Sequence, residues 1–292
     1  MAPDDQTTAA GGSAPDGAEP LDIVDSHVHL LPGRLGAKVR SWFEAAMGKE
    51  LVYPNDHGVI RERLADAGIR MAWTLPYAHK PGVAEGLNHA SARTAGESGA
   101  ALVVIGGATV HPADDAPELI VRRAVEDLGL RVLKLHCSVG DFPADDPRLD
   151  AMWAYVSAVA VPVVVHVGHS VNGHTDADEL VAVDTVARRF PEATIVIAHC
   201  GHHAVDAALD LVERHPGVHA DLTPVVRQHV AIDPARVASC ARKLMFGTDA
   251  PNTALTAESG VAWLRGLGLD DAALRAVAGG TARRLLAATP QF

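Results

Sequence analysis

The sequence predicts an α/β protein that folds as a single (β/α)8 TIM barrel. Eight short runs rich in Val, Ile and Leu alternate along the chain with amphipathic segments of helical period. The runs are mostly apolar on both faces, as expected of parallel strands that helices cover on both sides. Eight strands, each followed by a helix, is the number that closes this barrel. The length of 292 residues is ample for one such domain.

The chain begins with a segment, residues 1–20, that predicts no folded structure. It is rich in Ala, Gly, Pro, Asp and Thr and reads as a disordered tail. It lacks the basic start and apolar stretch of a signal peptide. With only three cysteines in the chain, we expect a cytoplasmic protein. The barrel domain is expected over residues 21–292.

The expected strands and helices follow in regular order. The strands are predicted at residues 23–30, 71–77, 101–110, 131–137, 162–168, 194–201, 218–223 and 243–248. Clear helical patterns occupy residues 60–67, 118–128, 149–160, 178–189 and 203–213. Gly68, Gly129 and Gly217 fall where helices should end before the next strand. A doubly wound open sheet is the alternative, but its first strand more often leads into a Gly-rich phosphate turn.

One connection is too long for a plain loop between strand and helix. Residues 31–55 contain Trp42, Phe43 and Tyr53. We expect a short helix here that lies over the mouth of the barrel.

Composition narrows the range of partners. Apolar residues make up 48% of the chain and charged residues 21%, as in ordinary soluble proteins. The net charge of −11 argues against a nucleic-acid-binding protein, which usually carries a basic face. No apolar run reaches the length of a membrane span. We expect a small-molecule substrate, and a homo-oligomer is compatible with the sequence.

Metal-ligand side chains follow several of the predicted strands. In Asp25-Ser26-His27-Val28-His29 the two histidines are two residues apart, so they project to the same face of a strand. Apolar strands also end in His166, His199 and Asp249. The carboxyl ends of all strands meet at one mouth of a TIM barrel. Imidazole and carboxylate groups converging there predict a site for a divalent metal such as zinc.

The motifs together resemble the amidohydrolase superfamily, in particular the branch called amidohydrolase family 2. The matching segments are Asp-Ser-His-Val-His in the first strand, Leu-Lys-Leu-His (133–136) in the fourth, Pro-Val-Val-Val-His (162–166) in the fifth, Ile-Ala-His-Cys-Gly (197–201) in the sixth and Phe-Gly-Thr-Asp-Ala-Pro (246–251) in the eighth. The resemblance extends from about residue 21 to about residue 289. It is specific for the superfamily but not for a substrate, because this barrel hosts many chemistries.

The resemblance implies a role for each matching residue. His27, His29, His166 and Asp249 would bind the metal, and Asp249 would also orient or deprotonate a metal-bound water. His199 would hold a second metal or the developing negative charge of the substrate. We expect Zn2+, with Mn2+ or Fe2+ as alternatives, and one or two ions.

Lys134 has three interpretations. Some superfamily members carry a carboxylated lysine at this position, which bridges two metals. An unmodified ammonium would instead bind an anionic group of the substrate, and the simplest alternative is an ion pair with Asp221 or Asp249. We prefer one metal ion with an unmodified Lys134. His136, two residues further on, should share its face.

Two other polar residues are candidates for substrate contacts. His202 lies in the loop after the sixth strand, close to His199. Arg227 follows the seventh strand, and its guanidinium could clamp a carboxylate.

The preferred function is metal-dependent hydrolysis of a small amide, lactone or ester by a metal-activated water. The alternative is a metal-dependent non-oxidative decarboxylase of the same family, and a third option is an inactive metal-binding barrel. Aromatic residues are only 4% of the chain, so we expect a mouth rich in His and small residues. Such a mouth favours a polar carbonyl substrate over an aromatic acid.

Overall fold

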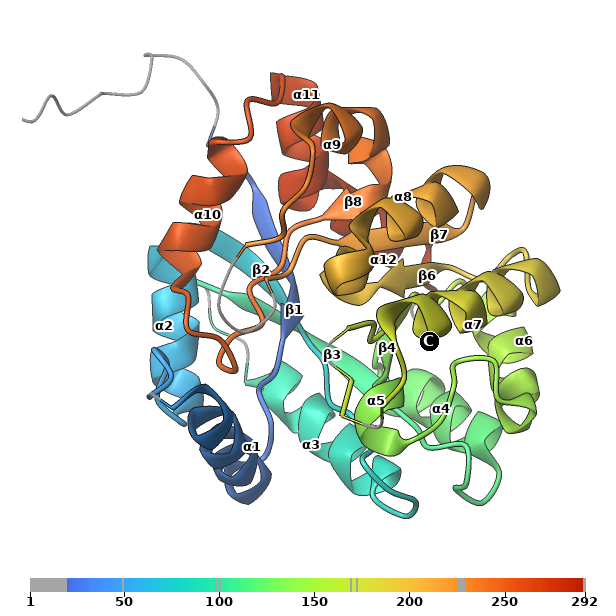
Figure 1. The fold of residues 1–292 in the computed structure, drawn as a ribbon. Helices are drawn as coiled ribbons and strands as arrows, with labels where there is room; N and C mark the ends of the chain where they lie inside the picture. The colour runs from blue at the N-terminus through green and yellow to red at the C-terminus, as the bar shows by residue number, and fades with distance from the viewer. Residues whose placement is uncertain are drawn as a thin grey trace, which may run out of the picture.

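Eight parallel strands form a nearly closed TIM barrel surrounded by helices (Figure 1). The computed structural model describes residues 20–48, 50–97, 99, 101–168, 170–171, 173–224 and 229–290. The strands follow the chain order, β1 (Ile23–Val28), β2 (Ile69–Thr74), β3 (Val103–Thr109), β4 (Val132–Leu135), β5 (Val163–Val165), β6 (Ile195–Ile197), β7 (Val218–Asp221) and β8 (Leu244–Met245). The predicted fold is confirmed. The predicted tail, apart from Pro20, lies outside the described residues.

The residues that follow β8 bring the two edges of the sheet together. The Ser26 amide donates to the Phe246 carbonyl at 2.9 Å, and the Asp249 amide donates to the His27 carbonyl at 2.9 Å. The His29 amide then donates to the Ala250 carbonyl at 2.7 Å. These bonds align the ends of β1 and β8, and so place His27, His29 and Asp249 side by side.

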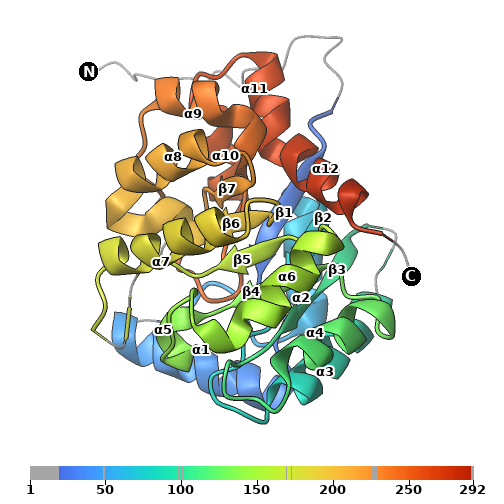
Figure 2. The same ribbon diagram turned by 90° about the vertical axis from the view of Figure 1, so that its right-hand side faces the viewer.

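Helices surround the sheet between successive strands (Figure 2). They are α1 (Gly33–Met47), α2 (His57–Asp66), α3 (Ala84–Gly96), α4 (Pro117–Glu126), α5 (Cys137–Gly140), α6 (Asp150–Ala158), α7 (Asp176–Arg189), α8 (Val205–Arg214), α9 (Pro234–Cys240), α10 (Ala257–Arg265), α11 (Asp271–Arg275) and α12 (Thr281–Ala288). Each predicted helical pattern corresponds to one of them. The long first connection forms α1, which has 15 residues and is longer than the short helix expected.

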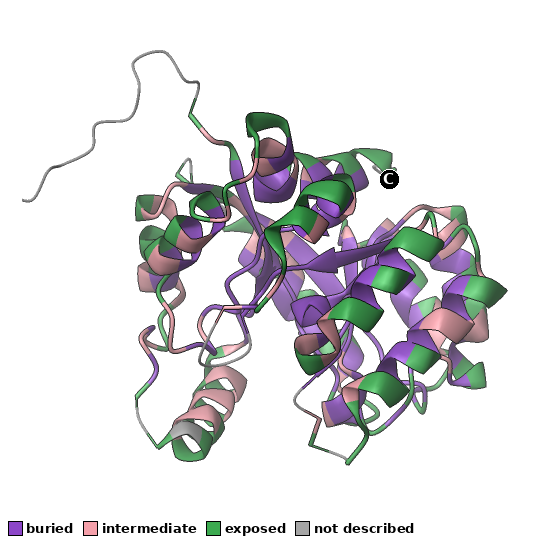
Figure 3. Cartoon of the chain, turned by 45° about the horizontal axis from the view of Figure 1, so that its top comes forward, coloured by how far each residue is buried: buried purple, intermediate pink, exposed green. Residues whose placement is uncertain are grey.

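The strands are buried, whereas the outer faces of the surrounding helices are exposed (Figure 3). One apolar cluster joins strands to the helices around them. A second cluster includes Val24, Val132, Val164 and Val196 from four strands, and Leu285 of α12 packs with them. This second cluster fills the interior of the barrel on the side that α12 covers. A polar site is therefore confined to the other end, where the carboxyl ends of the strands lie. Among the described residues, no helix is long and apolar enough to cross a membrane.

Several strands end earlier than the sequence predicts because the backbone turns sharply. After β6, four consecutive residues have positive φ: His199 (56°), Cys200 (45°), Gly201 (74°) and His202 (55°). Only one of the four is a glycine, and the left-handed region costs side-chain-bearing residues about 1–3 kcal/mol each. Such backbone persists only where surrounding contacts impose it. Here it places His199 at the mouth.

Two glycines give a direct test of the packing. Gly217 precedes β7, and a Cβ added there would lie 2.2 Å from the Ala193 carbonyl oxygen, a backbone atom that cannot rotate away. Gly86 is an exposed position in α3, and a Cβ there meets nothing within 4 Å. We expect Gly217→Ala to lower the free energy of unfolding by about 1–3 kcal/mol, whereas Gly86→Ala raises it by up to about 1 kcal/mol. Urea unfolding of the two variants checks this, and equal stability of Gly217→Ala and the parent would contradict the close approach.

Candidate metal centre

The two histidines of β1 lie together at the barrel mouth, as their spacing predicts. The ring centroids of His27 and His29 are 5.0 Å apart, and both side chains are buried. The His29 ring also packs edge-on against Tyr77, with centroids 5.4 Å apart.

Each of these imidazoles has one nitrogen held by a fixed acceptor. Nδ1 of His27 lies 2.9 Å from Asp221 Oδ2, and Nδ1 of His29 lies 2.7 Å from the Leu75 carbonyl oxygen. Because both acceptors favour a proton on Nδ1, both rings are left with Nε2 as the basic nitrogen. This is how proteins orient metal-binding histidines through their outer contacts.

Asp249 faces the two basic nitrogens. Its Oδ1 lies 3.1 Å from His29 Nε2 and 3.9 Å from His27 Nε2. Its backbone has φ of 62°, and its amide is bound to the His27 carbonyl, so the local chain is turned to present the carboxylate inward. Helix α10 is capped by Thr256, whose side chain accepts a hydrogen bond from the Ser259 amide, so Asp249 has no capping role there.

A second carboxylate, Asp25, holds the backbone of this cluster in place. It accepts hydrogen bonds from the Thr248 hydroxyl at 2.6 Å, the Thr248 amide at 3.0 Å and the His27 amide at 3.1 Å. Burial raises the pKa of Asp25 to about 7, while these hydrogen bonds oppose the rise. Asp25 therefore joins β1 to the segment after β8. The residues it joins come in the sequence shortly before His29 and Asp249, whose side chains face the mouth.

The donor set fits a divalent metal. One nitrogen from each of His27 and His29 and one oxygen of Asp249 all lie within 4.8 Å of one another. Ligand atoms that share an ion at about 2.0–2.2 Å are separated by a few ångströms, so these spacings are compatible with a common ion. Nearby, Nδ1 of His199 is buried and has no hydrogen-bond partner among the described residues. A buried unpaired imidazole nitrogen is costly unless a ligand or substrate uses it.

Three further histidines line the same cavity: His136, His166 and His199. His166 stacks on His136 with centroids 3.7 Å apart, and lies edge-on to His199 at 5.0 Å. Nε2 of His166 is 2.6 Å from the Gly168 carbonyl oxygen, which leaves Nδ1 as its basic nitrogen. The structure thus places His166 in the cavity but outside the three-residue group that surrounds a common point.

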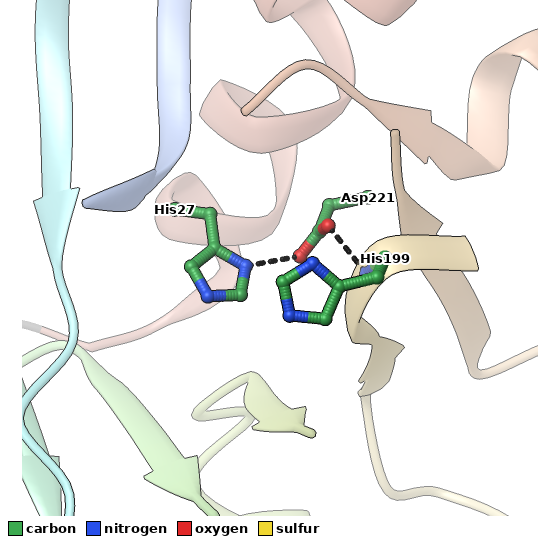
Figure 4. A group of neighbouring side chains, drawn as sticks. All are labelled: His27, His199 and Asp221. Carbon is green, nitrogen blue, oxygen red and sulfur yellow. Dashed lines mark hydrogen bonds and ion pairs between the residues drawn. The ribbon is translucent and has the colours of Figure 1, made fainter. Parts of the chain in front are cut away.

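His199 is fixed by its backbone. Its amide donates to Asp221 Oδ1 at 2.8 Å, while Asp221 Oδ2 faces His27 (Figure 4). The rings of His27 and His199 are 4.8 Å apart. A second group of potential ligands consists of His27, His199 and Asp221. Both oxygens of Asp221 already have partners there, so this carboxylate serves to position the histidines.

Burial sets the charge of the site. Desolvation is the largest influence on His27, His136, His166 and His199, and it holds the pKa of each well below its usual value. These rings are therefore neutral at pH 7, the form that binds metals. Burial raises the pKa of Asp249, while His29 and Lys134 oppose the rise.

Lys134 lies beneath the histidines and is fully buried. Its Nζ is 3.3 Å from His27 Nε2. Burial lowers the pKa of Lys134 to about 8, and the charges of Asp221 and Asp249 limit that fall. Neither carboxylate is within direct ion-pair distance of the ammonium in the described part of the chain, so the simple ion pair considered from the sequence does not form.

The remaining sequence candidates lie elsewhere. Nδ1 of His202 is 3.1 Å from Asp176 Oδ2, and its Cβ approaches Gly168 closely. The ring therefore supports the loop after β5 and does not line the cavity. Arg227 lies outside the described residues.

Aromatic side chains surround the mouth, contrary to the expectation from composition. Trp42, Phe43 and Tyr77 line the metal-site cavity together with its histidines. The same three side chains also line a larger adjoining chamber of about 350 Å³. Tyr53, the third aromatic residue of the long first connection, is buried elsewhere and accepts a hydrogen bond from the Ala257 amide. The low aromatic content led to the wrong expectation because composition does not show where in the fold the few aromatic residues lie.

Some residues that hold the site histidines in place were not recognised from the sequence. Asp221 ends β7 and was considered only as a partner for Lys134, although its position at a strand end could have marked it. Asp25 belongs to the Asp-Ser-His-Val-His motif, but its hydrogen bonds with Thr248 could not be read from the sequence. The same holds for the contact of the Leu75 carbonyl with His29, because both depend on which strands lie side by side.

Comparisons with known proteins identify the family and the fold of this chain. The sequence matches the family model described as amidohydrolase over residues 24–287. No curated protein matches it. An uncharacterised TIM-barrel protein from Bordetella bronchiseptica has a similar structure, with a TM-score of 0.74 and 20% identity over 92% of this chain and 99% of that one.

Two further solved structures share the fold. A 5-carboxyvanillate decarboxylase from Novosphingobium aromaticivorans, solved with bound manganese, has a TM-score of 0.66 and 13% identity over 94% of this chain and 98% of its own. A 4-oxalomesaconate hydratase from Rhodopseudomonas palustris has a TM-score of 0.62 and 14% identity over 91% of this chain and 96% of its own. At these identities the likeness concerns the fold alone.

The family match spans nearly the whole barrel. This chain belongs to the amidohydrolase family, a group of metal-dependent enzymes built on the TIM barrel.

Proposed function

We propose that this protein is a metal-dependent hydrolase of a small acyl compound, an amide, lactone or ester. The observation that carries the proposal is the position of Asp249, whose Oδ1 faces the basic nitrogens of His27 and His29 at 3.9 and 3.1 Å. This arrangement supplies ligands and a proton acceptor at one point. It is the combination that hydrolysis by an activated water requires.

The proposed ion ligands are His27 and His29 through Nε2, Asp249, and His166 through Nδ1. When bound, a divalent ion polarises a carbonyl group and makes water more acidic. We propose a single ion, because the carboxylate of the other candidate group, Asp221, already accepts hydrogen bonds from His27 and the His199 amide. Zn2+ suits the nitrogen and oxygen donors, and Mn2+ and Fe2+ remain alternatives.

The proposed proton transfer uses Asp249. Burial raises the pKa of this carboxyl group, which makes it a better acceptor for the proton of the attacking water. The new bond forms between the water oxygen and the carbonyl carbon. The proton then passes from Asp249 to the leaving nitrogen or oxygen as its bond to that carbon breaks.

His199 is proposed to support the charge that develops on the carbonyl oxygen, and Lys134 is proposed to act on the buried carboxylates instead. His199 is neutral and lines the cavity, so a ring N–H could donate to that oxygen. Lys134 is taken as unmodified. Since it lies beneath His27 and away from the cavity wall, we assign it to balancing the buried carboxylates and not to direct substrate contact.

A second candidate function is non-oxidative decarboxylation of an aromatic acid. Trp42, Phe43 and Tyr77 at the mouth favour it, because they provide apolar and ring surfaces for an aromatic substrate. The same metal ligands would serve, with a proton delivered to carbon and carbon dioxide released.

Metal content tests the ligand set. We expect the purified enzyme to hold about one equivalent of a transition metal, and His27→Ala/His29→Ala to lose most of it. His89→Ala, at an exposed histidine of α3, is the matched control and should keep the metal. Elemental analysis measures all three proteins. Full metal retention by the double variant would show that the ion is bound elsewhere.

Asp249→Asn tests the proton acceptor. The amide keeps the shape of the side chain but cannot take a proton, so kcat should fall by about 10²–10⁴ with little change in the urea midpoint. Asp176→Asn, which alters a carboxylate next to His202 outside the cavity, should keep kcat within about threefold of the parent. If Asp249→Asn holds metal and retains kcat within tenfold, Asp249 is not the base.

A paired substrate panel separates the two reactions. The metal-loaded enzyme would be assayed with esters, lactones and amides of aromatic and aliphatic acids, and with hydroxybenzoates and related acids. Hydrolysis predicts acid release from acyl substrates and no carbon dioxide. Carbon dioxide from an acid, with every acyl substrate intact, would decide for the decarboxylase.

A further inference from the structure

Helix α1 presents an apolar face that the protein core does not cover. Leu35, Lys38, Val39 and Trp42 follow the i, i+3, i+4, i+7 spacing that places side chains on one face of a helix. These residues line the chamber of about 350 Å³ beside the metal site. None of them is fully buried, and Trp42 is 47% exposed. The apolar face of α1 is therefore turned toward this chamber.

The chamber is continuous with the metal-site cavity. Six residues line both spaces, among them Trp42, Phe43, Tyr77 and His136. Trp42 and Phe43 pack edge-on at 4.9 Å, and Tyr77 packs on His136 at 4.8 Å. A molecule whose reacting group lies among the histidines therefore has one apolar space into which the rest of it can extend.

The charge of the chamber wall differs from that of the whole protein. The chain has 36 acidic and 25 basic residues. Among the residues that the structure describes, however, no acidic one lines the chamber, and Lys38 is its single Lys or Arg. Within the described residues, Lys38 has no carboxylate at ion-pair distance. His79 also lines the wall, and the positive charges of Lys80 and Lys38 add to burial in lowering its pKa. Among the described residues, Lys38 is thus the one Lys or Arg of this wall, and the neighbouring Lys80 adds to the positive charge that acts on His79.

We propose that the chamber is a specificity subsite for the part of the substrate remote from the reacting carbonyl or carboxyl group. It takes an aromatic or similarly flat apolar group that carries a second anionic substituent. Trp42 and Phe43 contact the apolar part, and Lys38 pairs with the anion. The proposal rests on the proposed function for the position of the reacting group, and extends it by defining the class of substrate.

The physical argument is one of complementarity. Binding of an aromatic ring is favourable because it removes the apolar wall of the chamber from water. Binding of an anion beside Lys38 is favourable because opposite charges attract, more strongly in a partly desolvated space than in open water. A neutral ring would leave Lys38 unpaired, and a small aliphatic substrate would leave the chamber unfilled.

Binding of simple acids to the zinc-loaded enzyme tests the proposal by calorimetry. The probes are benzoate and the three benzenedicarboxylates, in which the second carboxylate is ortho, meta or para to the first. We expect at least one dicarboxylate to bind about three- to tenfold more tightly than benzoate at low ionic strength. The advantage should shrink as salt is added, because it arises from charge.

Two substitutions in α1 test whether Lys38 causes the tighter binding of the dicarboxylate. Lys38→Gln should remove the advantage of the dicarboxylate and leave the Kd of benzoate within about twofold. Arg34→Gln removes a cation from the same helix that does not line the chamber, and should keep the advantage. The inference is overturned if no dicarboxylate binds more tightly than benzoate, if no acid binds at all, or if the advantage survives Lys38→Gln.

The His27→Ala/His29→Ala variant separates this inference from the proposed function. If benzoate binds it as well as the parent, the first carboxylate does not reach the metal site, and the proposed site fails. The comparison of Lys38→Gln with Arg34→Gln would still decide whether the chamber recognises a second anion.

Discussion

The Asp221 carboxylate connects three strands at the barrel mouth. One oxygen faces Nδ1 of His27 on β1, and the other accepts the amide of His199 after β6. The first contact decides which nitrogen of His27 is basic, and the second stabilises a left-handed backbone that would otherwise be unfavourable. Because both contacts come from one fully buried side chain, the orientation of the metal-binding face and the position of His199 are coupled.

Burial and charge act together to prepare the site for a cation. Neutral imidazoles and an ionised carboxylate bind metals, whereas burial alone would favour neutral forms of both. Burial lowers the pKa of His27, and the positive charge of Lys134 lowers it further. Burial raises the pKa of Asp249, and the same positive charge opposes that rise. It therefore keeps the histidine neutral and opposes protonation of the carboxyl group. Lys134 forms no ion pair with a carboxylate among the described residues, but its positive charge still affects the pKa of both neighbours.

The two parts of the mouth are built differently. The histidines and Asp249 are buried and come from strand ends joined by backbone hydrogen bonds. Trp42 and Lys38 belong to one face of helix α1, and both side chains are exposed. The barrel can therefore retain its chemistry while the residues of α1 vary, which is how one fold serves different substrates. The aromatic wall leaves two reactions in view, hydrolysis of an acyl compound and loss of carbon dioxide from an aromatic acid.

The sequence by itself determined the barrel, because apolar runs of strand length alternating with helical periods admit few other arrangements. The His-x-His pattern and the strand-terminal His166, His199 and Asp249 also located the mouth, since parallel strands end on one side. What the sequence could not determine depends on contacts between distant segments. Asp221 orients His27 across 194 residues. Trp42 and Tyr77 meet at one cavity although composition suggested few aromatics there. Only the tertiary structure decided these features, because closure of the barrel sets which side chains face one another.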